Sequence, residues 1–323
     1  MGGTPGVLGG GGLELQIDDT QRELSELGQR VVRIESAPAN TDLDLVHAFG
    51  SEPDNWQRVR NWYCNRVPLV VTPVISISTR SDRLALRAAA RMPGIVSSAR
   101  MRRELLEAAT AIVALTSYER GLVTNELGID KAIVHVMGNG VHLPARPLSH
   151  EVSSKLPPGN GSVLMVGRVT AWKRQADVLR AVAGRHPIVV AGPLESEPSR
   201  DKWEALVARA NAVWLGSVGR EELAGLYKRA RALVHLSVGE VQSLAILEAL
   251  STGTPVIASD IPPHRELERE YGSGWVRIID GPSGVTAALD DLDRHPPPRA
   301  QPEVPSARDV ASKLVALYQG VLS

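Results

Sequence analysis

The chain has 323 residues and carries 36 basic and 36 acidic side chains, so its net charge gives it no general attraction to nucleic acid. This length favours two domains over one. The single cysteine, Cys64, excludes an intramolecular disulfide and a cysteine-rich zinc site, which fits a reducing, cytoplasmic location. No basic segment followed by an apolar one opens the sequence, so we expect no signal peptide.

The first half begins with a glycine-rich stretch and a predicted helix over residues 13–27. Short apolar runs then predict strands at residues 31–34, 43–48, 69–74, 111–115 and 133–136. A doubly wound domain normally begins with a strand, yet residues 1–8 contain Pro5 and three glycines, which is poor chemistry for a central strand. We therefore expect the N-terminal domain to lack its first strand, and a regular central strand formed by residues 1–8 would refute this.

The second half shows a regular alternation of short apolar runs and helical patterns. The runs predict strands at residues 162–166, 187–191, 212–215, 232–236, 255–259 and 275–279. This alternation indicates βαβ units around a parallel sheet that is buried on both faces. The Pro-, Ser- and Gly-rich stretch 142–161 is interpreted as a linker, and residues 306–322 have the pattern of an amphipathic helix.

Glu240 and Glu248 flank a turn and the start of a helix, directly after a predicted strand. In open α/β sheets, ligands bind at the carboxyl ends of such strands. Helical rise would place the two acids roughly 12 Å apart, which is too far for a pair acting on one bond but suits an extended ligand held at two points. Two unrelated acids, one on the surface and one on the helix, are the alternative. Gln242, Ser243 and Leu244 should open the helix and turn its N–H groups toward an anion.

Two further segments have features of anion sites. Arg168 and Lys173 follow the predicted strand 162–166, and together they could neutralise a diphosphate, Arg as a fork and Lys as a point charge. A solvated basic loop is the alternative. Gly11 and Gly12, near the start of the chain, would let backbone approach a ligand closely, although a disordered tail fits this glycine run equally well.

In this order, the motifs resemble the retaining GT-B glycosyltransferases of family 4, the glycosyl transferases group 1. The resemblance covers about four fifths of the chain and is strongest over residues 161–268. The order of motifs is quite specific, whereas each motif alone would be weak. The motifs are Gly167-Arg168…Lys173, Ala191-Gly192-Pro193, Leu215-Gly216-Ser217-Val218, Glu221…Leu223…Tyr227, the Glu-x7-Glu element at Glu240 and Glu248, and Gly253-Thr254-Pro255-Val256. A weaker match in the first half comprises a Gly-Gly-x-Glu turn ending at Glu14, Asp44-Leu45-Val46-His47 and Gly138-Asn139-Gly140-Val141.

The resemblance implies an α/β fold with two Rossmann-like doubly wound domains that face a cleft. Residues 1–147 would form the acceptor side, residues 148–303 would bind the nucleotide sugar, and residues 304–323 would form a helix crossing back to the first domain. It further implies a retaining, hexosyltransferase-like enzyme without a bound metal or cofactor. Such an enzyme would move a sugar from a nucleotide-diphosphate donor to an unknown acceptor, which could be a glycan, a lipid-linked saccharide or a small metabolite.

The resemblance also assigns roles to single residues. Glu240 would lie by the donor sugar, Arg168 and Lys173 would hold the diphosphate, and these three are the expected catalytic residues. Glu248 would anchor the ribose. The other residues expected to bind the donor are Gln242, Ser243, Leu244, Gly11, Gly12 and Val218.

The chain departs from the family pattern in three places, one of which is His142, where aspartate is common. Val241-Gln242-Ser243 stands where Gly-aromatic-Gly is usual, and Phe49 stands where many relatives have a second histidine. His47 is a candidate on the acceptor side, although a packed strand histidine is the default interpretation. The Asp42-Leu43-Asp44 segment lies at the start of a predicted strand, away from the basic loop, and is interpreted as structural rather than metal-binding.

One stretch of the first half is strongly basic. Seven arginines between Arg80 and Arg103 face a single acid, Asp82, and could contact anionic lipid or a phosphate-bearing acceptor on the inner face of a membrane. A solvated helical face is the alternative. The rival functions are a nucleotide-sugar epimerase or hydrolase on the same fold, and a non-catalytic sugar-nucleotide-binding subunit.

Overall fold

The computed structural model describes residues 11–34, 41–77, 79–92, 97–159, 161–182, 184–195 and 199–323. The chain divides into two compact units. Unit 1 comprises Met1–Gly140 with Pro305–Ser323, and unit 2 comprises Val141–Val304. Both units contain a parallel sheet with helices, which confirms the predicted α/β class.

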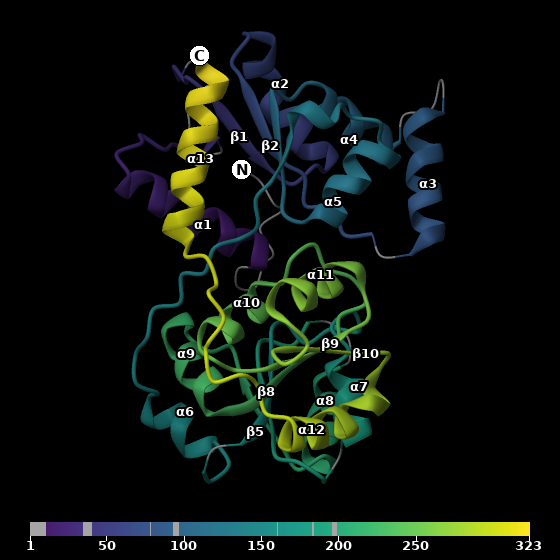
Figure 1. Cartoon of the computed structure of the whole chain (residues 1–323), viewed down its shortest axis with the longest axis vertical. Coiled ribbons are helices and arrows are strands. Elements are labelled where there is room, and N and C mark those ends of the chain that lie inside the picture. The colour runs from purple at the N-terminus through teal and green to yellow at the C-terminus, as the bar shows by residue number, and fades with distance from the viewer. Residues whose placement is uncertain are drawn as a thin grey trace. The chain divides into compact units, whose positions relative to one another are not determined.

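The sheet of unit 1 has four parallel strands that follow one another in chain order. Figure 1 labels the first two of them. Neighbouring strands are in close register: Val46 lies opposite Leu69, and Ile112 opposite Val134. Short apolar runs form these strands because both faces of the sheet are covered. The strands are β1 (Val46–Phe49), β2 (Leu69–Thr72), β3 (Ala111–Ala114) and β4 (Val134–Val136).

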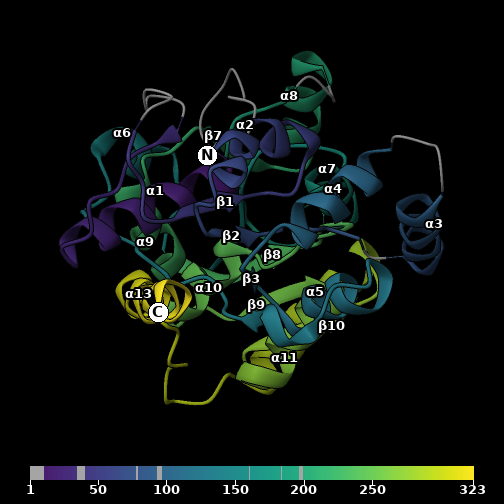
Figure 2. The same cartoon turned by 90° about the horizontal axis from the view of Figure 1, so that it is seen from above.

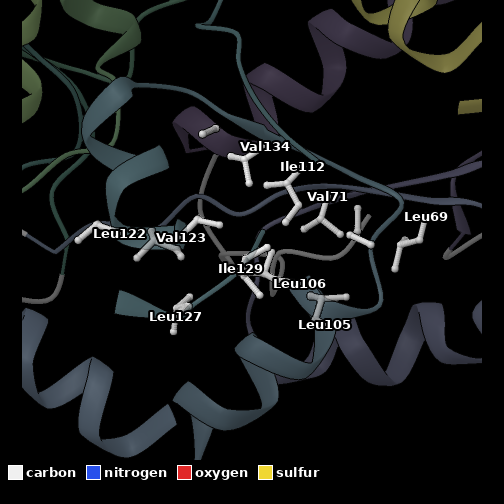
Figure 3. Close-up of a cluster of buried hydrophobic side chains, with 14 of the residues drawn as sticks. Leu69, Val71, Leu105, Leu106, Ile112, Leu122, Val123, Leu127, Ile129 and Val134 are labelled. Atoms are coloured by element: carbon white, nitrogen blue, oxygen red, sulfur yellow. The ribbon is translucent and has the colours of Figure 1, made fainter. Parts of the chain in front are cut away.

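Alternate side chains of this sheet enter two separate cores. Val71 and Ile112 belong to a large cluster with Leu105, Leu106 and Leu122, which Figure 3 shows in close-up. Their neighbours along the strands point to the opposite face, as the period of two in a strand requires. There Val70 and Val113 pack with Leu24 of α1 (Gly12–Glu26) and Leu314 of α13 (Ala307–Leu322).

The helices of unit 1 include the C-terminal one, which packs against the first helix of the described chain (Figures 1 and 2). This C-terminal helix, α13, begins with a capping box in which Ser306 and Asp309 bond each other's backbone N–H groups. The helices are α1 (Gly12–Glu26), α2 (Pro53–Cys64), α3 (Arg80–Arg91), α4 (Ser98–Glu107), α5 (Ser117–Gly121) with a π-helical turn over Leu122–Glu126, and α13 (Ala307–Leu322).

The sheet of unit 2 has six parallel strands in the order β10-β9-β8-β5-β6-β7. The strands are β5 (Ser162–Val166), β6 (Ile188–Ala191), β7 (Ala212–Gly216), β8 (Ala230–His235), β9 (Val256–Ser259) and β10 (Val276–Ile279). The helices are α6 (His150–Lys155), α7 (Gln175–Val182), α8 (Arg200–Arg209), α9 (Arg220–Arg229), α10 (Leu244–Ser251), α11 (Pro262–Tyr271) and α12 (Val285–Arg294). Two buried clusters cover the two faces: Val163 and Met165 of β5 enter one, and Leu164 enters the other.

Ten of the eleven predicted strands form, with bounds that differ from the predictions by at most three residues. The exception is residues 31–34, where the prediction of a strand is wrong: Val31–Arg33 has no regular structure and pairs with no strand in the described chain. An apolar run without a neighbouring strand cannot form a ladder. The predicted absence of a strand in residues 1–8 lies outside the described residues.

The interpretation of residues 142–161 as a linker is wrong for a large part of that stretch. Residues His150–Lys155 form α6, which begins at the N-cap Ser149. Leu148, Val152 and Leu156 pack against the buried core of unit 2. The Pro and Ser residues that suggested a linker therefore serve as turn and cap around a short amphipathic helix.

No helix of the described ranges is long and apolar enough to cross a membrane.

Candidate functional site

The strand order of unit 2 reverses at β5. The chain continues from β5 to β6 on one side, whereas β8 lies on the other side of β5. Ligands of open α/β sheets bind at such a switch point, outside the carboxyl ends of the two strands. The loops that leave this edge are residues 167–174 after β5 and residues 236–243 after β8. In unit 1, the four described strands follow chain order and contain no such reversal.

The loop after β5 is held by a buried glutamine at the start of α7. Gln175 is only 3% exposed, and its amide donates to the Arg168 carbonyl at 2.8 Å while accepting from the Thr170 N–H at 3.3 Å. The Thr170 hydroxyl in turn accepts from the backbone N–H of Lys173 at 3.1 Å. These bonds fix the backbone on both sides of the predicted diphosphate-binding cations.

The loops after β5 and β8 meet at an ion pair. Lys173 Nζ contacts Glu240 Oε1, which also lies 3.0 Å from His235 Nε2. The same His235 nitrogen is 3.2 Å from the Ser243 hydroxyl, at the N-cap of α10. Two residues that the sequence separates by 67 positions are therefore joined at the switch point.

The charges of this cluster follow from its burial. Burial opposes ionisation of Glu240, but the hydrogen bond from His235 and the Lys173 charge outweigh it and hold its pKa well below the ordinary value. Burial and then the Lys173 charge lower the pKa of His235, while Glu240 acts in the opposite direction. His235 is therefore neutral at pH 7, and its Nε2–H is the donor to the Glu240 carboxylate. The site consists of a cation, an anion and a neutral hydrogen-bond donor.

A second buried histidine, His264, packs against the ring of His235. His264 is fully buried in α11, and its ring lies edge-on to His235 at 5.6 Å between centroids. Its Nδ1 lies 3.0 Å from the Ser259 carbonyl. The Ser259 hydroxyl donates to the Ser237 carbonyl at 2.6 Å, which ties the end of β9 to the loop after β8. His264 therefore braces the site without contacting Lys173 or Glu240 by a hydrogen bond.

Arg168, the other predicted cation, has a different partner. Its guanidinium bonds Glu195, after β6, at 3.1 Å, and both side chains are nearly half exposed. Exposed pairs of this kind contribute little to stability. Arg168 can exchange Glu195 for a phosphate at low cost.

Glu248 lies inside α10 and is 4% exposed. Its carboxylate accepts a hydrogen bond from the Tyr227 hydroxyl at 3.0 Å, and Arg220 lies 3.7 Å away. Burial, then Glu248, raises the pKa of Tyr227 well above its ordinary value, so Tyr227 stays protonated as the donor. Glu240 and Glu248 are thus held by different groups, the first at the basic loop and the second against α9.

The N-terminus of α10 has the features predicted for an anion site. Ser243 is its N-cap residue and Leu244 its first helical residue, preceded by Gln242. The Ser243 hydroxyl makes no capping hydrogen bond and points to His235 instead. The first N–H groups of the helix therefore have no acceptor from their own N-cap side chain, which suits an incoming anion.

The remaining predicted site residues are spread over both units. Val218 is half-buried between β7 and α9 of unit 2. Gly11 is the N-cap of α1 and Gly12 its first residue, both in unit 1, and an added Cβ at Gly12 would meet open space. Their contact with a donor stays a prediction.

His47 in β1 is engaged on both ring nitrogens. Nδ1 lies 2.6 Å from the Tyr318 hydroxyl and Nε2 lies 2.9 Å from the Thr72 hydroxyl, and the ring stacks on Phe49. Burial lowers its pKa to about 3. These contacts join β1, β2 and α13, as the default interpretation of a packed histidine expects, and the acceptor-side role stays a prediction.

Most of the basic stretch is paired with neighbouring acids. Arg87 bonds Glu126, Arg102 bonds Glu52, and Arg100 and Arg103 bond acids one turn later on α4. These pairs fit a solvated helical face, and contact with a membrane stays a prediction. Over the described residues, no cluster of three histidine, cysteine or acidic side chains is placed to hold a metal ion.

Sequence reasoning missed several residues that build the site. His235, His264 and Gln175 carry no motif that distinguishes them from other strand-end or helix residues. Trp172 directly precedes Lys173 in the sequence, but no role was predicted for it. A polar residue at the end of an apolar strand, such as His235, is the one signal that pointed to the carboxyl edge of the sheet.

Most of unit 2 matches the model of a known protein family. Residues 149–298 match the family described as glycosyl transferases group 1. Two similar relatives are D-inositol 3-phosphate glycosyltransferases, from Nocardia farcinica and Frankia alni, each 27% identical over 88% of this chain. The chain spans 66% of the length of the first and 74% of the second.

Solved structures share the fold at low sequence identity. A glycosyltransferase involved in avilamycin A biosynthesis aligns with a TM-score of 0.61 and 17% identity, over 97% of this chain and 91% of that one. Anabaena HepE, in complex with UDP and glucose, aligns with a TM-score of 0.57 and 15% identity, over 86% of this chain and 74% of that one. The comparisons support a glycosyltransferase function. The chain thus resembles the group 1 glycosyltransferases in sequence and has their GT-B type of fold.

Proposed function

We propose that this protein is a retaining glycosyltransferase whose unit 2 binds a nucleotide-diphosphate sugar. The observation that carries the proposal is the contact of Lys173 with Glu240 at the switch point between β5 and β8. It combines a cation for the diphosphate with a carboxylate for sugar hydroxyl groups. The uncapped start of α10 adds backbone donors beside them.

The proposed reaction is a front-face displacement that needs no base from the protein. The bond between the anomeric carbon and the phosphate oxygen breaks, and the acceptor oxygen bonds the same face of that carbon. The acceptor proton passes to the departing phosphate oxygen. Lys173 and Arg168 stabilise the negative charge that grows on the diphosphate, and such preorganised groups are usually the largest contribution to catalysis.

Lys173 can serve the diphosphate without releasing Glu240. An ammonium group has three donors, and the contact with Glu240 uses one of them. Glu240 keeps a fixed orientation because His235 also donates to it. Glu240 would thus orient the donor sugar, while Glu248, held by Tyr227, would accept hydrogen bonds from the ribose hydroxyls.

The compared proteins suggest which substrates to test first. HepE is solved with UDP-glucose as well as with UDP and glucose, and the two curated relatives carry D-inositol 3-phosphate in their names. We infer uridine-diphosphate sugars as the first donors to try, with inositol 3-phosphate among the acceptors.

Product analysis tests the proposal. Purified protein is incubated with UDP-, GDP- and ADP-sugars, each with and without a panel of monosaccharide, inositol phosphate and lipid-linked acceptors. We expect an acceptor-dependent glycoside whose anomeric configuration, read by NMR, equals that of the donor. Inverted product, an epimerised donor or acceptor-independent free sugar would contradict it. Nucleotide binding without any product would instead favour a non-catalytic subunit.

A further inference from the structure

Trp172 is the one exposed tryptophan among the six of this chain, all of which the structure describes. It is 50% exposed, whereas Trp62, Trp203 and Trp275 are buried and the remaining two are half-buried. A large aromatic surface left in solvent loses the stabilisation that burial would provide. A single exposed aromatic side chain is common on protein surfaces and needs no ligand to explain it. What distinguishes Trp172 is that its ring is hydrogen-bonded to Gly239, the residue before Glu240.

The indole is fixed in place rather than free to rotate. Its Nε1–H donates to the Gly239 carbonyl at 2.7 Å, and its own carbonyl accepts from the Val238 N–H at 2.9 Å. These bonds join the loop after β5 to the loop after β8. Because the N–H of the ring is already hydrogen-bonded to Gly239, the rest of the ring presents only apolar surface.

The neighbours of Trp172 indicate which end of the proposed nucleotide-sugar ligand the indole would contact. Trp172 precedes Lys173, and Gly239 precedes Glu240, so the ring is tied to the two residues that contact each other at the switch point. Glu248 is held elsewhere, by Tyr227 and Arg220 on α9. On the proposed assignment of Glu240 to the donor sugar, the bond to Gly239 ties the indole to the sugar end of the site.

We propose that Trp172 is a stacking platform for the C–H face of a sugar or cyclitol ring at the reaction centre. The proposal rests on the proposed function and adds a binding residue to it. A ring of this kind has an apolar face and a polar rim, and aromatic side chains in ligand sites bind the apolar part while few polar groups fix orientation. Either the donor sugar or the acceptor ring has this chemistry.

The test compares Trp172→Ala with Trp172→Phe, which keeps an aromatic ring but loses the N–H. Calorimetry measures Kd for the nucleotide sugar that supports transfer and for its sugar-free nucleoside diphosphate, and kinetics give KM for the acceptor. Tyr63→Ala removes another exposed aromatic, on α2, and serves as the control. Thermal melting of each variant checks that the fold is retained.

If the donor sugar stacks, Trp172→Ala should raise Kd for the nucleotide sugar about three- to tenfold and leave Kd for the nucleoside diphosphate unchanged. If the acceptor stacks, only its KM should rise, by the same factor. Trp172→Phe should keep most of the affinity, and Tyr63→Ala all of it. The proposal would be overturned if Trp172→Ala left both Kd for the nucleotide sugar and KM for the acceptor unchanged. It would also be overturned if Kd rose equally for the nucleotide sugar and for the nucleoside diphosphate. Equal losses in Trp172→Phe and Trp172→Ala would do so too, because the bond to Gly239 rather than the ring would then be responsible.

These outcomes are separable from the proposed function. Sugar transfer by both the wild type and Trp172→Ala with equal constants removes the platform and leaves the enzyme assignment standing. A wild-type protein that binds no nucleotide sugar removes both.

Discussion

At the level of single residues, the candidate site depends on charges that are balanced within a partly buried cluster. The order of motifs in the sequence predicted Glu240 and Lys173 as site residues, and the structure brings them into contact. The sequence could not predict His235 as the donor that fixes Glu240, because that requires knowing which side of β8 faces the loop. Neutral His235 lets the cluster hold one cation and one anion without a further charge.

Buried neutral histidines predict a loss of stability in acid. Burial lowers the pKa of His264 to about 3, below the value near 6.5 expected in the unfolded chain. Between those two values the unfolded state binds a proton that the folded state does not. The free energy of unfolding is therefore not reduced by His264 above about pH 6.5. Below that pH it falls by roughly 1.4 kcal/mol per pH unit for one such histidine.

The variant His264→Phe should reduce this dependence. Urea unfolding followed between pH 7.5 and pH 5 is expected to show a shallower fall for the variant than for the wild type. His150→Ala, which removes an exposed histidine on α6, is the control. A variant slope equal to that of the wild type would show that His264 is protonated in the folded protein.

At the level of elements, the strands were predictable and the loops were not. Apolar runs such as Val163–Met165 read directly as strands because a parallel sheet buries both faces. Residues 31–34 have the same composition but no neighbouring strand in the described chain, and composition alone does not show this. The helix α6 was missed because six residues between Pro- and Ser-rich stretches give too short a pattern to distinguish from a turn.

The path of the loop after β5 depends on a close backbone approach at Gly192. A Cβ added to Gly192 would lie 2.0 Å from the Gly167 carbonyl oxygen. The loops after β5 and β6 can therefore approach this closely only because residue 192 has no side chain. Gly192→Ala should push Gly167 and the cations that follow it out of position. We expect a loss of about 1–3 kcal/mol in stability, as for other overpacked sites, together with weaker binding of a nucleoside diphosphate.

Thermal melting and calorimetry check this prediction against Gly320→Ala. Gly320 lies in α13, and a Cβ added there meets no atom within 4 Å. Its replacement should leave nucleotide binding unchanged and stabilise the helix slightly. If Gly192→Ala melts and binds like the wild type, the close approach does not position the basic loop.

At the level of the whole molecule, the two units differ in what their sheets offer a ligand. Unit 2 has a strand-order reversal with cations on one side and a carboxylate on the other, whereas the four described strands of unit 1 follow chain order. The motifs of the second half are accordingly dense, and those of the first half sparse. The parallel α/β class could be predicted because alternating apolar and helical patterns repeat along the chain. The residues that would bind an acceptor could not be predicted in the same way, because the loops of the first half have no recurring pattern.

The most direct test of the account is calorimetric titration of the wild type and Lys173→Ala with UDP, GDP and ADP and their sugars. Removal of Lys173 should weaken binding of the diphosphate by about 1.5–3 kcal/mol, the usual contribution of a hydrogen bond to a charged group. Arg180→Ala, which removes an exposed cation from α7, is the matched control. We predict that one nucleoside diphosphate binds the wild type and Arg180→Ala equally, and binds Lys173→Ala at least tenfold more weakly. Equal binding to all three proteins, or no binding to any of them, would contradict a diphosphate site at the switch point of unit 2.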